Sequence, residues 1–198
     1  MAYFELSFQK RLGEDCKGSI DDDSRVIELG PKYIDWPVYL LAFINRGLTK
    51  AYIGDLDGAI SDATLLINIG ADADTAYSNR GNYKVLKGDL DGSIADFNRA
   101  IELQSHVDEY YYNRGNAKRA NGDMEGAIAD CTHAIELHST QYSYFYRGNA
   151  RALERNWVEA LADYKNWPDP GSETQRKCSF VVFCYVTASS CWQTELRP

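Results

Sequence analysis

The sequence predicts an all-α solenoid of antiparallel helix pairs, and three observations lead to this fold class. The tripeptide Asn-Arg-Gly occurs three times and is followed by Tyr-Arg-Gly, so that Arg46, Arg80, Arg114 and Arg147 stand 34, 34 and 33 residues apart. A second motif, which begins with Gly-Asp, keeps the same period. Apolar residues within one period are spaced by three and four, as on one face of a helix. A repeat of this length with two helices is typical of a stacked helical array.

The composition is that of a folded protein, because 44% of the 198 residues are hydrophobic and 25% are charged. The formal net charge of -8 repels phosphate, so we expect no nucleic acid and no membrane as partner. The five cysteines are odd in number and widely spaced, which favours reduced thiols and a cytoplasmic location. We expect no signal peptide, and an apolar run such as residues 180–186 is far shorter than the roughly 20 residues of a membrane-spanning helix.

Each repeat is predicted to turn at a Gly-Asp pair, as in Gly54-Asp55, Gly88-Asp89 and Gly122-Asp123. Glycine can take the left-handed conformation that ends one helix, and aspartate can cap the next. The sequence Asp55-x-Asp57-Gly58 also resembles part of a calcium loop. The third ligand and the closing glutamate of such a loop are missing, so we expect helix caps and no metal.

A second glycine lies inside the first helix of each repeat, where it costs about 1 kcal/mol relative to alanine. Small residues at a matching place on the second helix indicate that the two helices cross closely there. The glycines are Gly47, Gly81, Gly115 and Gly148, and their expected small neighbours are Ala59, Ser93, Ala127 and Ala160.

The arginine before each of these glycines is predicted to form an ion pair with an aspartate on the second helix. A half-buried guanidinium needs a carboxylate to offset the loss of its hydration. Ligand binding by the arginines is the alternative. The aspartates are Asp62, Asp96, Asp130 and Asp163.

Together these motifs resemble the tetratricopeptide repeat (TPR) family. An aromatic residue precedes the glycine in each repeat, and a small residue precedes Ile-Glu-Leu, as at Ala100 and Ala134. The aromatic residues are Phe43, Tyr77, Tyr111 and Tyr144. The resemblance covers residues 40 to about 167 and implies a right-handed superhelix. The chain departs from the family where arginine replaces the usual leucine and Lys50, Lys84, Lys118 or Arg151 replaces the usual tyrosine.

The repeat register divides the chain into segments. Residues 1–33 are expected to be a degenerate repeat, because Gly18-Ser19-Ile20-Asp21 aligns with the motif at Gly92. Residues 34–39 form an inserted connector, in which we expect Trp36 to be buried. Pro168 should end the last repeat early. The expected segments are repeats at 40–73, 74–107 and 108–140, a truncated repeat at 141–170 and a non-repeat tail at 171–198 that is disordered or an irregular cap.

In TPR proteins the first helices line a concave groove, and the resemblance places asparagines and aromatic residues on it. An amide both donates and accepts hydrogen bonds, which suits the backbone of an extended peptide. Aromatic residues are enriched at binding hot spots. The alternative is that the asparagines bridge neighbouring helices. The candidate residues are Asn45, Asn79, Asn82, Asn113, Asn116, Asn149, Tyr112, Tyr142, Phe145 and Tyr146.

We therefore expect a protein-interaction module that binds an extended peptide or a partner helix in this groove. A structural or self-assembling role through the solenoid ends is the alternative, so the chain is expected to be a monomer or to self-associate weakly. The sequence has no nucleophile elbow, phosphate-binding loop or zinc-protease helix, so we expect neither enzyme activity nor a cofactor. The residues His106, His133, His138 and Cys131 lack the spacing of metal ligands.

Chaperone-binding TPR proteins hold a C-terminal carboxylate with lysine and arginine. The matching places in this chain carry no basic residue, and they are Ser78, Asn82, Asn113, Tyr142 and Tyr146. A heat-shock chaperone C-terminus is therefore not expected as the partner.

Overall fold

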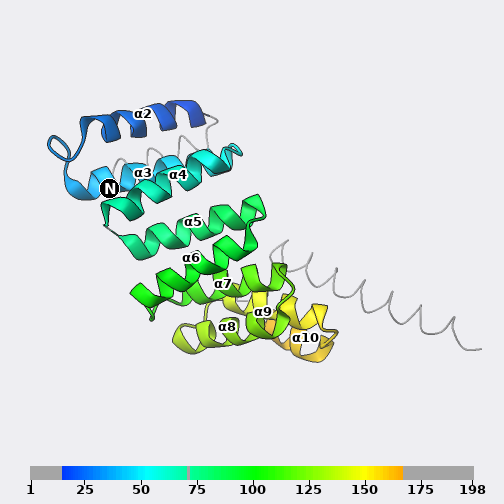
Figure 1. Cartoon of the computed structure of the whole chain (residues 1–198). Helices are drawn as coiled ribbons and strands as arrows, with labels where there is room; N and C mark the ends of the chain where they lie inside the picture. Colours follow the sequence, from blue (N-terminus) through cyan, green and yellow to red (C-terminus); the bar gives the residue numbers. More distant parts are fainter. Residues whose placement is uncertain (1–14, 71, 167–198) are drawn as a thin grey trace, which may run out of the picture. The chain divides into compact units, whose positions relative to one another are not determined.

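The computed structural model describes residues 15–70 and 72–166, which form α-helices joined by turns and contain no strand. The predicted all-α solenoid is confirmed. The chain divides into two compact units, unit 1 up to Ser105 and unit 2 from His106. In each unit, every helix packs against the next one in the chain (Figure 1).

The described part of unit 1 contains two complete helix pairs and a preceding helix, α2. Its helices are α2 (Cys16–Leu29), α3 (Trp36–Tyr52), α4 (Leu56–Ile69), α5 (Ala73–Lys87) and α6 (Leu90–Leu103). One core cluster joins Leu40 and Phe43 of α3 to Leu66 of α4 and Ala76 of α5. The second helix of one pair therefore shares a core with the first helix of the next.

Residues 106–166 of unit 2 form two helix pairs, and the first helices of these pairs, α7 and α9, also contact each other. Its helices are α7 (Asp108–Ala120), α8 (Met124–Leu137), α9 (Gln141–Leu153) and α10 (Trp157–Lys165). Phe145 and Trp157 pack around buried Ala160 and Tyr164 at the α9–α10 crossing.

The turns within the pairs follow the predicted chemistry. Gly88 has a φ of 86° and ends α5, and the Oδ1 atom of Asp89 accepts a hydrogen bond of 3.0 Å from the Gly92 N–H at the start of α6. The equivalent caps are made by Asp15, Asp55 and Asp123. The predicted helix caps are thus confirmed, and these carboxylates serve the helix termini.

The last turn departs from this pattern. Arg155 takes the left-handed conformation with a φ of 63°, where the other turns have glycine. Asn156 stands at the cap of α10 and makes no side-chain cap hydrogen bond. Arg155 therefore adopts a left-handed conformation that is unfavourable for a residue with a Cβ atom. The packing of α9 against α10 offsets this cost.

The close approach at the packing glycines is present, but its partners differ from those predicted. A Cβ atom on Gly115 would lie 3.1 Å from the Ala127 carbonyl oxygen and 2.9 Å from the Cys131 sulfur. At Gly81 and Gly148, however, the nearest atoms belong to the rings of Phe97 and Tyr164. We predicted that a small residue of the second helix would face each glycine, and this prediction is wrong at these two crossings. The glycine is covered by the aromatic residue that lies one turn after the small residue.

At the crossing of α3 and α4, the space beside the glycine is filled by a residue from a third helix. The residue at the place of Phe97 is Ala63, which leaves space beside Gly47. Tyr83 of the next pair fills it, and its hydroxyl would lie 3.2 Å from a Cβ atom on Gly47. Tyr83 is buried against Ala59 and Ala63. A ring therefore fills the space beside three of these glycines, from the paired helix at Gly81 and Gly148 and from the next pair at Gly47.

The expectation that Trp36 is buried is wrong. Helix α3 begins at this residue, and Pro37 suits the first helical turn because it has no N–H to satisfy. Trp36 is consequently 45% exposed and contacts Tyr39 at a ring distance of 5.7 Å. The predictions for Pro168, for the tail at 171–198 and for the first part of the degenerate repeat lie outside the described residues.

Candidate functional site

The predicted arginine–aspartate pairs are confirmed in every repeat. In the first, Arg46 donates from Nε and Nη2 to the two carboxylate oxygens of Asp62, over 3.0 and 2.6 Å. The side chain of Asp62 is only 2% exposed. The other pairs are Arg80–Asp96, Arg114–Asp130 and Arg147–Asp163.

A second cation completes each pair, and a hydroxyl group takes part in most of them. Lys50 lies 2.9 Å from Asp62, and the remaining Nη1 of Arg46 donates to the Ser24 hydroxyl of the preceding helix. In the other three pairs, the second cation beside the aspartate is Lys84, Lys118 and Arg151, in chain order. These arginines are held by scaffold contacts, which leaves the alternative of ligand binding by them without support.

The candidate asparagines of unit 1 differ in their surroundings. Asn45 is 5% exposed, and its Oδ1 atom has no hydrogen-bond partner among the described residues. Asn79 and Asn82 are half-buried on α5, three residues apart and therefore on one face of that helix. Of the three, only Asn79 and Asn82 offer an accessible amide.

The candidate asparagines of unit 2 are engaged within the unit. Asn113 hydrogen bonds to the Glu109 carboxylate, and the Oδ1 of Asn116 accepts from Arg119 at 2.9 Å. The Oδ1 of Asn149 accepts from the Tyr164 hydroxyl at 2.7 Å.

The candidate aromatic residues of unit 2 lie together, and we call Tyr112, Tyr142, Phe145 and Tyr146 the aromatic surface. The ring of Tyr112 on α7 lies 5.8 Å from that of Tyr142 and 6.0 Å from that of Tyr146, both on α9. Phe145 adjoins Tyr146 at 5.4 Å. Tyr142 is 49% exposed and the other three are half-buried. Such a set offers broad apolar area with hydroxyl groups at its edges.

Acidic residues adjoin this surface. Burial raises the pKa of Tyr112 well above its usual range, and the neighbouring carboxylates of Glu109 and Asp108 raise it further. The pKa of Glu109 is itself raised, first because nearby side chains displace water from the carboxyl group and second because of Asp108. Glu109 as a whole is still exposed, so its carboxylate can face a ligand.

Sequence reasoning missed two contributors to this site. Arg119 was not among the candidates, although it stands three residues after Asn116 and so shares its helical face. Tyr164 orients Asn149 from the second helix of the pair. A search for polar residues three or four apart from each candidate finds Arg119, whereas the contact with Tyr164 requires the packing of α10 on α9.

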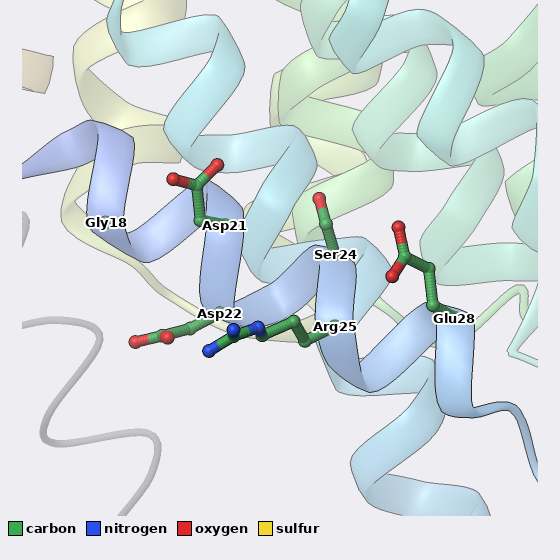
Figure 2. A pocket seen from close by; sticks show the side chains of 6 residues that line it. All are labelled: Gly18, Asp21, Asp22, Ser24, Arg25 and Glu28. Carbon is green, nitrogen blue, oxygen red and sulfur yellow. The ribbon is translucent and has the colours of Figure 1, made fainter.

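A separate hollow of about 570 Å³ lies beside α2, and Figure 2 labels the residues of this helix that line it. Its described lining residues all belong to this single helix, namely Gly18, Asp21, Asp22, Ser24, Arg25 and Glu28. The Ser24 hydroxyl already accepts a hydrogen bond from Arg46. One helix face with acidic side chains does not by itself define a binding site.

Among residues 15–70 and 72–166, no group of three or more His, Cys, Asp or Glu side chains is arranged to hold a metal ion. No helix within the described part of the chain is long and apolar enough to cross a membrane.

Paired antiparallel helices with a constant period and a glycine at each crossing define a helical-repeat protein of the solenoid class. The family model for the tetratricopeptide repeat matches residues 74–106 and 108–140. These two segments of the chain are tetratricopeptide repeats.

Solved structures share this fold. A thermophilic TPR protein of Thermus thermophilus superposes with a TM-score of 0.77 at 16% identity, over 92% of this chain and 98% of that one. MamA superposes with a TM-score of 0.65 at 21% identity, over 82% and 92%. The first TPR of Spaghetti (RPAP3), bound to an HSP90 peptide SRMEEVD, gives 0.54 at 20% identity, over 58% and 95%. By sequence, no curated protein matches the chain.

Proposed function

We propose that this chain is a non-enzymatic protein-interaction scaffold that binds an extended peptide or a partner helix on the aromatic surface of α7 and α9. The observation that carries the proposal is the clustering of Tyr112, Tyr142 and Tyr146 on two first helices of unit 2. TPR proteins are generally scaffolds, and one of the similar structures is a peptide complex. Clustered tyrosines are the residue type that dominates binding energy at interfaces.

The proposal is tested with a partner captured from a lysate of the native cells and then purified. The double variant Tyr112→Ala/Tyr146→Ala should bind this partner about 10-fold or more weakly, as expected for hot-spot tyrosines. Tyr142→Ala is a second variant, since its ring is 49% exposed and adds little to the core. Tyr52→Ala is the matched control, because Tyr52 is a 73% exposed tyrosine of α3 in unit 1. Unchanged affinity in both test variants would exclude the aromatic surface as the binding site.

The asparagines are tested by the same measurement. If amides hold the ligand backbone, Asn79→Ala/Asn82→Ala should weaken binding by about 5- to 150-fold, from two hydrogen bonds of roughly 0.5–1.5 kcal/mol each. Its melting temperature should barely change. A lower melting temperature with unchanged affinity would mean that these asparagines belong to the scaffold.

A heat-shock chaperone C-terminus is not the proposed ligand. The places expected to hold its carboxylate carry amide, hydroxyl and aromatic side chains, and Glu109 adds a negative charge beside Asn113. A synthetic SRMEEVD peptide should therefore fail to compete with the captured partner.

Self-assembly is the second candidate function, and the exposed apolar side chains of α10 favour it. Val158 is 78% exposed and Leu161 is 43% exposed. Sedimentation velocity at two concentrations distinguishes the functions, because assembly predicts a dimer fraction that rises with concentration and disappears in Val158→Asp.

A further inference from the structure

The aromatic surface has an acidic end. Asp108 and Glu109 lie in the first turn of α7, and Glu109 stands three residues before Tyr112, on the same helical face. The hydrogen bond from Asn113 holds the Glu109 carboxylate at this face. The carboxylate is therefore kept beside the tyrosine rings.

The rings themselves favour a positive charge. The face of an aromatic ring carries partial negative charge, so a cation is attracted to it. Tyr112 and Tyr142 lie 5.8 Å apart with an angle of 31° between their planes, and Tyr142 is 49% exposed. A side chain approaching Tyr142 from solvent meets two ring systems and a carboxylate.

The cations of unit 2 near this surface are already engaged. Arg114 and Lys118 of α7 pair with Asp130. On α9, Arg147 and Arg151 both pair with Asp163.

Arg119 is a further described cation on α7. It donates to Asn116 and stands seven residues after Tyr112, roughly 10 Å along the helix. Among the described residues of unit 2, no cation is ion-paired with Asp108 or Glu109 at this end of the surface.

We propose that the aromatic surface recognises a basic peptide segment, with a lysine or arginine side chain lying over Tyr112 and Tyr142 and its charge directed toward Glu109. This inference rests on the proposed function and names the chemistry of its partner. An acidic ligand would instead place its carboxylate against Asp108 and Glu109.

The test selects phage-displayed random decapeptides on the wild-type chain and counter-selects them on Tyr112→Ala/Tyr146→Ala. Peptides that depend on the two tyrosines should be enriched in lysine or arginine. Because the chain carries a net charge of -8, basic peptides that bind both proteins equally reflect general attraction and are removed by the counter-selection.

A selected peptide is then synthesised with its key basic residue replaced by norleucine, which removes the charge and keeps the apolar stem. Affinity should fall by about 2- to 30-fold, the range of a cation over an aromatic ring. Glu109→Gln should weaken the lysine peptide at low salt, and the effect should shrink at high salt. The matched control is Glu125→Gln, since Glu125 lies in the first turn of α8 and is not part of this surface.

The outcomes separate the two proposals. Tyrosine-dependent peptides that are acidic or uncharged would overturn the basic partner and leave the proposed function intact. Equal losses for Glu109→Gln and Glu125→Gln would also overturn it. If no peptide depends on Tyr112 and Tyr146, the binding role of the surface fails, and the basic partner fails with it.

Discussion

Arg80 on α5 donates two parallel hydrogen bonds to Asp96 on α6, 2.9 Å from Nε to Oδ2 and 2.6 Å from Nη2 to Oδ1. Lys84 adds a contact of 2.8 Å to the same carboxylate. The hydrogen bond with Asp96 is the main reason why the pKa of Arg80 is raised. One nearly buried carboxylate thus holds two cations of the facing helix.

This arrangement makes Asp96 more important for stability than either cation. Asp96→Ala should lower the free energy of unfolding by about 3–5 kcal/mol, because it leaves two half-buried cations unpaired. Arg80→Ala should cost less, since Lys84 still pairs with Asp96. In the double variant the losses should not add, with a coupling energy of about 0.5–3 kcal/mol by urea denaturation.

The control for this cycle is the ion pair of Arg99 and Glu102 on α6, where both side chains are more than half exposed. Its coupling energy should stay below about 1 kcal/mol. Equal coupling in the two cycles, or additive losses at Arg80 and Asp96, would contradict a structural role of the buried pair.

The packing glycines should differ in their tolerance of a methyl group. A Cβ atom on Gly81 would lie 2.9 Å from two ring atoms of fully buried Phe97, so Gly81→Ala should cost about 1–3 kcal/mol in unfolding free energy. In Gly47→Ala the added Cβ atom would lie 3.2 Å from the Tyr83 hydroxyl, so the loss of unfolding free energy should be smaller. Thermal melts of both variants test this, and a larger loss at Gly47 would refute the assigned packing.

Arg155 is expected to be a site where a single change stabilises the protein. Its φ of 63° strains a residue with a Cβ atom by roughly 1–2 kcal/mol, whereas glycine adopts this conformation freely at some entropic cost. Arg155→Gly should therefore raise the free energy of unfolding by about 0.5–1 kcal/mol. The reverse control is Gly122→Ala, at a φ of 89°, which should lower it. A destabilised Arg155→Gly would show that the arginine side chain itself stabilises the turn.

Cys131 should make stability depend on pH in the alkaline range. Burial raises the pKa of its thiol from 9.0 to about 12, so the folded state favours the neutral form. Its contribution is fully present below pH 9 and is lost as the pH rises toward 12. The unfolding free energy should fall more steeply than that of Cys131→Ala above pH 9, by up to about 1.4 kcal/mol per pH unit. Parallel curves would mean that Cys131 ionises in the folded protein as it does when unfolded.

Much of the fold was predictable from the sequence alone, because each motif recurs at a constant interval. The arginine and the aspartate of each pair recur 16 residues apart, which is why the pairing of Arg80 with Asp96 follows from spacing. The caps at Asp55, Asp89 and Asp123 were predictable for a different reason. They depend on backbone contacts only three residues away, so no long-range packing enters.

Tertiary structure alone decided what fills each space and which polar groups are occupied. Spacing places Asn149 on a helix face, but it does not indicate that the Tyr164 hydroxyl of the packed helix takes its hydrogen bond. Nor does it show that Phe97 covers Gly81 while Tyr83 reaches Gly47. Helical periodicity determines the direction in which a side chain leaves the backbone. The conformer of a long side chain, and its partner among several within reach, are decided by the competition for space and hydrogen bonds once the helices have packed.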